Sequence, residues 1–363
     1  MRDDWTCEVS NFGFAPDDSV NKILVWGTPR IGDVVMAFPA LKLIRAHVPQ
    51  AQVVWLTTDY ARELVELSGL ADEVWTFTYR ARLRNRLEFF RFRWAIRRAR
   101  FDRIFIFGNL EKYRRFLGPL ERTHHSFAVS GGGLRAERNA QTVMKALNLP
   151  GEIIPDPSLE LPDSPKAARK LTDVGLKAGR PYLVMHPGCS YMRRRWVLSK
   201  VRRVPRFWPT DNYVRLVMNL HDALPEYGFV IVGSRQEQPI VEQKIMRQIG
   251  PRPEVFNLCG QTTLRELLQI LKHAALLVCG NSGVMHLATI TRTPMVGLFR
   301  STKEVGSEPW TEPGRVRLLR PTPTGNADPM SCISVERVRD EVLAMIRLLV
   351  AGDSLSAECH PRG

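Results

Sequence analysis

The sequence predicts an α/β protein of two domains, each a parallel sheet with helices on both faces. Strand-like apolar runs alternate with amphipathic helix-like runs along most of the chain, which is the pattern of such sheets. A proline-rich stretch at residues 150–165 separates two halves that repeat this alternation. The length of 363 residues suits two domains of about 100–200 residues each.

Both halves show the same order of elements. In the first, strands are expected at residues 22–26, 53–57, 73–77, 103–107 and 125–129, and helices at 33–47, 59–67 and 137–149. In the second, strands are expected at 182–186, 229–233, 255–258, 276–280 and 295–299, and helices at 211–224, 238–249, 263–274, 283–291 and 335–350, with the last ending at Gly352. We therefore expect a tail over 1–20, an N-terminal domain over 21–160, a C-terminal domain over 161–350 and a tail over 351–363.

The composition is ordinary for a soluble protein except for its charge. Six scattered cysteines without a C-x-x-C pair predict neither a zinc site nor a disulfide framework, and they suit a reducing cytoplasm. No run of about 18 apolar residues is present, so we expect a cytoplasmic protein without a membrane span. The net charge of +15 favours an anionic partner. A nucleic acid is not predicted, because we find neither a reading module nor a stacking motif.

Basic residues concentrate in two stretches. Residues 80–103 contain ten arginines against two acids, and residues 193–206 contain seven basic residues and no acid. In the first stretch apolar residues recur at helical spacing, at Leu83, Leu87, Phe90 and Trp94. This pattern is typical either of a helix with one buried stripe or of a helix that lies on a membrane surface. The arginine excess favours the second, on the anionic inner face of the cytoplasmic membrane.

The first motif with chemical meaning is T-P-R-I-G-D at residues 28–33, directly after the first expected strand. Asp33 stands where a helix begins, at the carboxyl end of a strand, where open α/β sheets bind ligands. Its carboxylate is either a helix N-cap or a general base that takes the proton of an attacking hydroxyl as the new bond forms. Asp33 is therefore the candidate catalytic residue.

A second motif, C-G-N-S-G-V-M-H at residues 279–286, joins a strand to a helix through small residues. Exposed amides at such a helix start bind anions and suit a diphosphate. Ser282 adds a hydroxyl donor, and His286, about one turn into the helix, either faces the same anion or is a core histidine. The candidate nucleotide-binding residues are Asn281, Ser282, Gly283 and His286.

Two further strand ends carry polar residues. Glu237 follows the strand at 229–233 and is either placed to accept ribose hydroxyls or is a solvent-facing glutamate. The sequence H-P-G-C at 186–189 closes the first strand of the second half and opens the loop that carries the second basic stretch. Arginines on such a loop can reach the phosphates of a nucleotide or of an acceptor.

Taken together, these motifs resemble the heptosyltransferases, glycosyltransferase family 9, over residues 22–349. The ordered set comprises residues 28–33 with P-A-L at 39–41, F-D at 101–102, H-P-G at 186–188, W-P at 208–209, L-C-G at 258–260 with T-L at 263–264, and S-G-x-x-H-L-A at 282–288. The resemblance implies a GT-B fold, with two Rossmann-like domains facing a central cleft. It also implies inverting, metal-independent transfer, without a cofactor, of heptose from ADP-heptose to a phosphorylated, lipid A-linked core saccharide.

The resemblance also assigns roles to residues. Asp33 is expected to be the base, Glu237 to bind the ribose, and residues 281–286 to bind the diphosphate. The family's lysine two residues before Trp-Pro falls on Arg206, which is expected at the donor. The residues expected to bind the acceptor are Arg30, Arg80, Arg82 and Arg84.

The sequence departs from the family pattern at the donor site. Asn281 stands where the family has aspartate, so a charge is missing near the sugar, and the loop at 189–206 is longer than usual. Arg194 or Arg195 is an alternative counterpart of the family's lysine. These departures leave open a transferase that uses another nucleotide sugar on a cell-surface glycan, or a non-catalytic nucleotide-sugar binder that docks on membranes. The presence of Asp33 favours an enzyme.

Overall fold

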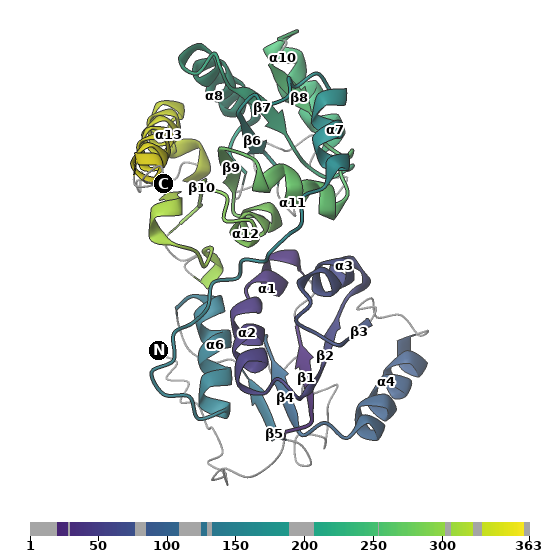
Figure 1. The fold of residues 1–363 in the computed structure, drawn as a ribbon. Helices are drawn as coiled ribbons and strands as arrows, with labels where there is room; N and C mark the ends of the chain where they lie inside the picture. Colours follow the sequence, from purple (N-terminus) through teal and green to yellow (C-terminus); the bar gives the residue numbers. More distant parts are fainter. Residues whose placement is uncertain are drawn as a thin grey trace, which may run out of the picture. The chain divides into compact units, whose positions relative to one another are not determined.

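The computed structural model describes residues 20–27, 30–76, 85–108, 125–128, 133–188, 207–252, 254–301, 306–321 and 329–358. They form two compact units, each a sheet with its own helices (Figure 1). The first unit contains the described residues up to Pro157 together with residues 306–310, and the second contains the remainder from Ser158 onwards. The expected division after residue 160 lies close by, but the return of residues 306–310 to the first unit was not expected.

The first unit is a five-stranded sheet in the order β3-β2-β1-β4-β5, with all strands parallel. The strands are β1 (Lys22–Trp26), β2 (Gln52–Thr57), β3 (Glu73–Thr76), β4 (Arg103–Ile106) and β5 (His125–Ala128). The chain starts at central β1, winds out to β3 and returns to β4 on the other side of β1. The strand order therefore reverses between β1 and β4, the place where ligands bind in such sheets.

Helices cover both faces of this sheet (Figure 1). They are α1 (Ile31–Val35), α2 (Phe38–His47), α3 (Asp59–Ser68), α4 (Asn85–Ala99) and α6 (Arg135–Ala146). Helices α2 and α6 pack together, whereas α4 lies on the opposite face (Figure 1). Ile96 of α4 belongs to the same buried cluster as Leu24 and Trp26 of β1. The prediction of a single helix over 33–47 is wrong, because the structure has two helices there, α1 and α2. Pro39 at the start of α2 has no N–H to donate, and its ring would clash with the carbonyl four residues earlier in a continuous helix.

The second unit is a six-stranded parallel sheet in the order β11-β10-β9-β6-β7-β8. The strands are β6 (Tyr182–His186), β7 (Gly228–Ile231), β8 (Val255–Asn257), β9 (Leu276–Gly280), β10 (Met295–Leu298) and β11 (Val316–Leu319). Here the chain winds from β6 to β8 and then crosses to β9 on the other side of β6. The order reverses between β6 and β9.

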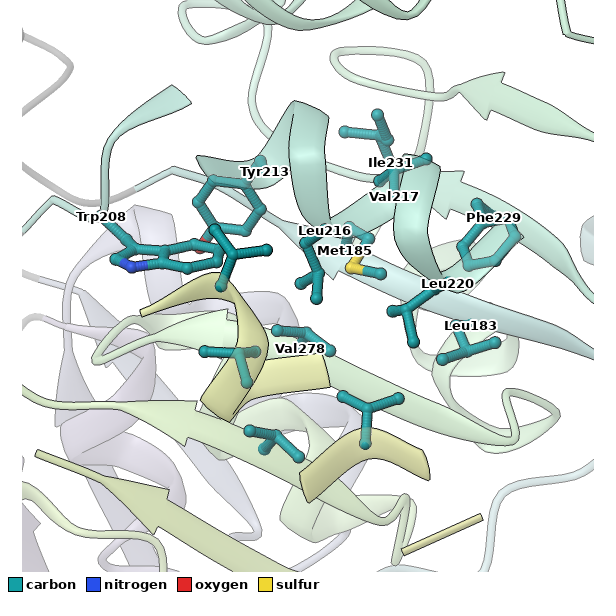
Figure 2. Close-up of a cluster of buried hydrophobic side chains, with 14 of the residues drawn as sticks. Leu183, Met185, Trp208, Tyr213, Leu216, Val217, Leu220, Phe229, Ile231 and Val278 are labelled. Carbon is teal, nitrogen blue, oxygen red and sulfur yellow. The ribbon is translucent and has the colours of Figure 1, made fainter. Parts of the chain in front are cut away.

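The helices of the second unit again lie on both faces of the sheet. They are α7 (Pro165–Asp173), α8 (Thr210–Ala223), α9 (Gln238–Val241), α10 (Arg247–Ile249), α11 (Leu264–Lys272), α12 (Gly283–Ile290) and α13 (Val335–Glu358), with a π-helical turn (Glu242–Met246) between α9 and α10. Leu183, Met185 and Phe229 face α8, and Trp208 packs edge-on against Tyr213 at a centroid distance of 4.9 Å (Figure 2). On the other face Tyr182 donates a hydrogen bond to the Ile270 carbonyl of α11.

Four single elements differ from expectation. Helix α7 and edge strand β11 were not expected. Helix α13 continues past Gly352 to Glu358, because one helical glycine costs only about 1 kcal/mol. The buried stripe considered for α4 is not formed by Phe90 and Trp94, which are 63% and 61% exposed. Within the described part of the chain, no helix is both long and apolar enough to cross a membrane.

Candidate functional site

Three strand ends bring polar side chains together in the second unit. His186 is the last residue of β6, Ser282 follows β9 as the N-cap of α12, and Glu237 follows β7 as the N-cap of α9. Because β6 lies between β9 and β7, His186 lies between the other two. Its Nδ1 is 3.1 Å from Ser282 Oγ, and its Nε2 is 3.9 Å from Glu237 Oε2. The cluster lies where the strand order reverses.

His186 orients the Ser282 hydroxyl through a hydrogen bond. Side chains alternate along β6, so His186 points away from the core formed by Leu183 and Met185. Burial lowers the pKa of His186, against the raising effect of Glu237, and the imidazole is neutral near pH 7. In the tautomer that carries its proton on Nε2, on the side of Glu237, Nδ1 accepts a hydrogen bond from the Ser282 hydroxyl. Ser282 makes no side-chain cap to α12, so the first amides of α12 remain available to an anion.

Glu237 is buried and hydrogen-bonded, so the interpretation of Glu237 as a solvent-facing glutamate is wrong. The residue is 5% exposed, and the Ser234 N–H donates to its Oε2 at 2.6 Å. Two glycines enclose the carboxylate. A Cβ at Gly188 would lie 2.0 Å from Glu237 Oε1, and one at Gly233 would lie 3.1 Å from Oε2. The H-P-G turn after β6 therefore needs glycine at 188 so that the backbone can pass close to the carboxylate.

The remaining predicted donor residues follow β9. The Asn281 N–H donates to the Leu298 carbonyl at 3.2 Å, and Gly283 is the first residue of α12. His286 is buried in α12 at 4% exposure, as expected for a core histidine, and its carbonyl accepts from the Thr289 hydroxyl. Contact of His286 with a bound anion stays a prediction. Arg206 lies outside the described residues.

In the first unit, Asp33 is the third residue of α1 and pairs with Arg135, the first residue of α6. The N-cap of α1 is Arg30, so the interpretation of Asp33 as an N-cap is wrong. The pKa of Arg135 is lowered, first by burial and then by the charges of Arg138 and Arg30. Arg30 and Arg138 thus lie close enough to Arg135 for their charges to act on it. Asn139 donates to the Met36 carbonyl at 3.0 Å, which fixes α6 against the end of α1.

The remaining site residues are of two kinds. Some predicted residues lie outside the described part of the chain, and some residues of the site were not predicted from the sequence. Arg80, Arg82 and Arg84 lie outside the described residues. His186 was recognised only as part of a motif, and its contact with Ser282 spans 96 positions of sequence. No sequence pattern indicated that Arg135 contacts Asp33, because the two residues are 102 positions apart. Where side chains are described, no group of three or more His, Cys, Asp or Glu residues is placed to hold a metal ion.

The fold is similar to those of solved glycosyltransferases. E. coli ADP-heptose LPS heptosyltransferase II matches with a TM-score of 0.69 and 21% identity, over 90% of this chain and 99% of that chain. A family 9 glycosyltransferase from Veillonella parvula matches with a TM-score of 0.73 and 15% identity, over 90% and 97%. The chain therefore has the GT-B fold, which confirms the fold expected from the sequence.

Sequence comparison identifies the family. The sequence model of glycosyltransferase family 9 (heptosyltransferase) matches residues 120–326, more than half of the chain. Lipooligosaccharide heptosyltransferase 2 of Campylobacter jejuni is 23% identical over 80% of this chain and 84% of its own length. Lipopolysaccharide heptosyltransferase 3 of E. coli K12 is 27% identical, but the match spans only 40% of this chain and 38% of that protein. The chain belongs to glycosyltransferase family 9 and is a glycosyltransferase of the heptosyltransferase type.

Proposed function

We propose that this protein transfers heptose from ADP-heptose to a phosphorylated, lipid-linked core saccharide in lipopolysaccharide biosynthesis. The observation that carries the proposal is the Ser282–His186–Glu237 cluster beside the uncapped start of α12. It offers amides and a hydroxyl to a diphosphate and a carboxylate to a ribose. The sugar and the nucleotide come from another solved relative, the E. coli heptosyltransferase WaaC, whose structures contain ADP-2-deoxy-2-fluoro heptose and ADP.

The proposed reaction is a single displacement without a metal. The acceptor oxygen attacks the anomeric carbon as the bond from that carbon to the diphosphate oxygen breaks, which inverts the configuration. The acceptor proton passes to Asp33, and ADP leaves with the bonding electron pair. The α12 amides and the Ser282 hydroxyl stabilise the charge that develops on the diphosphate.

Asn281 favours one alternative within the same class. An amide in place of the family's aspartate keeps hydrogen bonding but removes a negative charge near the sugar. A transferase that uses another nucleotide sugar is therefore the second candidate.

Nucleotide binding to the full chain distinguishes these candidates. We expect ADP to bind at least tenfold more tightly than UDP or GDP in isothermal titration calorimetry, because the assigned donor carries ADP. Glu237→Gln is expected to weaken ADP binding by about tenfold or more, because hydrogen bonds to charged groups contribute about 1.5–3 kcal/mol. Preference for UDP would remove the heptose assignment, and absence of nucleotide binding would contradict a transferase.

We further propose that α4 holds the enzyme on the anionic inner face of the cytoplasmic membrane, which places it near a lipid-linked acceptor. Ile96 is buried against the sheet, which turns exposed Phe90 and Trp94 outward on the opposite side of α4. Arg97 and Arg98 are exposed, and the Arg98 guanidinium lies 5.1 Å from the centre of the Trp94 ring. Aromatic rings flanked by arginines suit the headgroup region of an anionic bilayer.

Vesicle co-sedimentation tests the role of α4. The paired substitution Phe90→Ala with Trp94→Ala is expected to reduce retention on phosphatidylglycerol vesicles at physiological salt by about tenfold, because interfacial binding scales with buried apolar area. Tyr60→Ala is the matched control, since Tyr60 is a similarly exposed aromatic residue (64%) on α3. Equal retention of the paired variant and the control would contradict the proposal.

A further inference from the structure

We propose that His186 takes up a proton when a diphosphate binds, which reverses its hydrogen bond with Ser282 and turns the Ser282 hydroxyl to the diphosphate. His186 is then a positioning residue of the donor site, and binding of the donor is linked to pH. The inference rests on the proposed function, because the diphosphate is that of the nucleotide sugar. It deepens that function by stating the protonation state in which the site holds its donor.

The Ser282 hydroxyl has a single proton, and two acceptors compete for it once a diphosphate is bound. In the nucleotide-free protein the hydroxyl donates to Nδ1 of His186, over an Oγ–Nδ1 distance of 3.1 Å. An ionised diphosphate oxygen has no hydrogen to donate and needs the same proton. The two demands are compatible only when Nδ1 becomes a donor, because the hydroxyl oxygen can accept one hydrogen bond while it donates another.

The fold keeps the two side chains in contact. Strands β6 and β9 pair in parallel with His186 opposite Cys279, and Ser282 follows three residues later. The Tyr213 hydroxyl of α8 donates to the His186 carbonyl at 3.4 Å. Rotation of Ser282 away from the ring would leave Nδ1 without a donor on a residue that is 5% exposed, and an unpaired buried acceptor is costly. A change of protonation preserves the contact, whereas a change of rotamer loses it.

A change of tautomer alone does not resolve the competition. It would move the proton from Nε2 to Nδ1 and leave a lone pair on Nε2 facing Glu237. Nε2 lies 3.9 Å from Glu237 Oε2, so a lone pair there meets a negative oxygen. The carboxylate has little room to withdraw, because it is bonded to the Ser234 N–H and enclosed by Gly188. The imidazolium avoids this conflict, since it donates from Nδ1 to Ser282 and presents Nε2–H to Glu237.

The titratable neighbours of His186 come from four elements. Glu237, at the start of α9, is the charged group that acts on the ring. The Tyr213 hydroxyl of α8 contacts the backbone carbonyl. Burial raises the pKa of the Cys279 thiol of β9, which stays uncharged. His286 is buried one turn into α12 and is the alternative proton acceptor, which the experiment below tests.

A bound diphosphate favours the imidazolium through its charge. In the nucleotide-free protein burial lowers the pKa of His186, against the raising effect of Glu237. The diphosphate adds negative charge on the Ser282 side of the ring, and a nearby negative charge raises the pKa of a histidine. The proton comes from solvent, bonds to the Nδ1 lone pair and returns to solvent when ADP leaves. Because the complex holds one proton more than the free protein, ADP affinity falls as the pH rises.

The test is isothermal titration calorimetry of the full chain with ADP in buffers of different ionisation enthalpy at about pH 7.5. ADP is then already ionised, since the last proton of a phosphoryl group has a pKa of about 6. We expect uptake of about one proton per ADP, and an affinity that falls by up to about tenfold per pH unit between about pH 7 and 8. His186→Gln should take up none and bind ADP independently of pH in this range. His221→Gln is the matched control, because His221 lies 3.1 Å from Glu254 in the same unit, and it should behave like the wild type.

Each outcome supports or overturns the inference. ADP binding without proton uptake overturns it and leaves the proposed function standing, whereas absence of ADP binding contradicts the proposed function itself. Equal uptake in His186→Gln places the proton elsewhere, such as on His286, and also overturns it. Ser282→Ala should take up less than half as much as the wild type, and undiminished uptake there would exclude the reversed hydrogen bond. If His186→Gln does not fold, the wild type and Ser282→Ala decide the question.

Discussion

Replacing Asp33 with Asn is expected to lower kcat for transfer by about 10²–10⁴-fold, the range that a general base contributes. Asparagine has nearly the same shape, and its amide oxygen still accepts a hydrogen bond from Arg135, so the start of α1 should keep its conformation. The amide cannot take up the acceptor proton. Transfer measured by ADP release should therefore fall sharply, whereas calorimetric ADP affinity should stay within twofold of the wild type.

Asp59→Asn is the matched control for this prediction. Asp59 is also an acid in the first turn of a helix of the first unit, so the substitution makes the same change of charge in a similar local setting. Its kcat should equal that of the wild type. Full activity of the Asp33→Asn variant would exclude Asp33 as the base, and comparable losses in both variants would indicate a general effect of charge.

Much of the fold could be predicted because central parallel strands are buried on both faces. Such strands are short apolar runs, and β1, β6 and β9 have the expected bounds. Edge strand β11 escaped prediction because Arg317 interrupts its apolar run and three of its four residues are partly exposed. The exposure of Phe90 and Trp94 on α4 could not be predicted either. It depends on which side of the helix faces the sheet, and buried Ile96 marks that side.

The candidate site was predictable in position but not in its contacts. Motifs at the ends of β1, β7 and β9 indicate the edge of each sheet at which these polar side chains lie, because parallel strands bring their carboxyl ends together. The sequence does not show which side chains meet there. The contacts of His186 with Ser282 and of Arg135 with Asp33 join distant positions. They depend on strand order and helix packing that no local pattern encodes.

Gly188→Ala is expected to weaken ADP binding by about 10- to 100-fold. The packing of the central strands of the second unit should stay the same. The added Cβ would lie 2.0 Å from Glu237 Oε1 and 2.4 Å from its carboxyl carbon, so the carboxylate must move. It has little room, because it is buried and bonded to the Ser234 N–H, and Gly233 lies on its other side. Loss of well-placed hydrogen bonds to a charged group costs about 1.5–3 kcal/mol, which corresponds to the expected loss of affinity.

Gly314→Ala separates this steric effect from the general effect of replacing glycine. A Cβ at Gly314 meets nothing within 4 Å, so that variant should bind ADP like the wild type. Overpacking at Gly188 should also lower the free energy of unfolding by about 1–3 kcal/mol, measured by urea denaturation. If Gly188→Ala binds ADP normally despite that loss of stability, Glu237 does not bind the ribose. Its burial would then serve only the packing of the H-P-G turn, and Ser282 with the α12 amides would be left to hold the nucleotide.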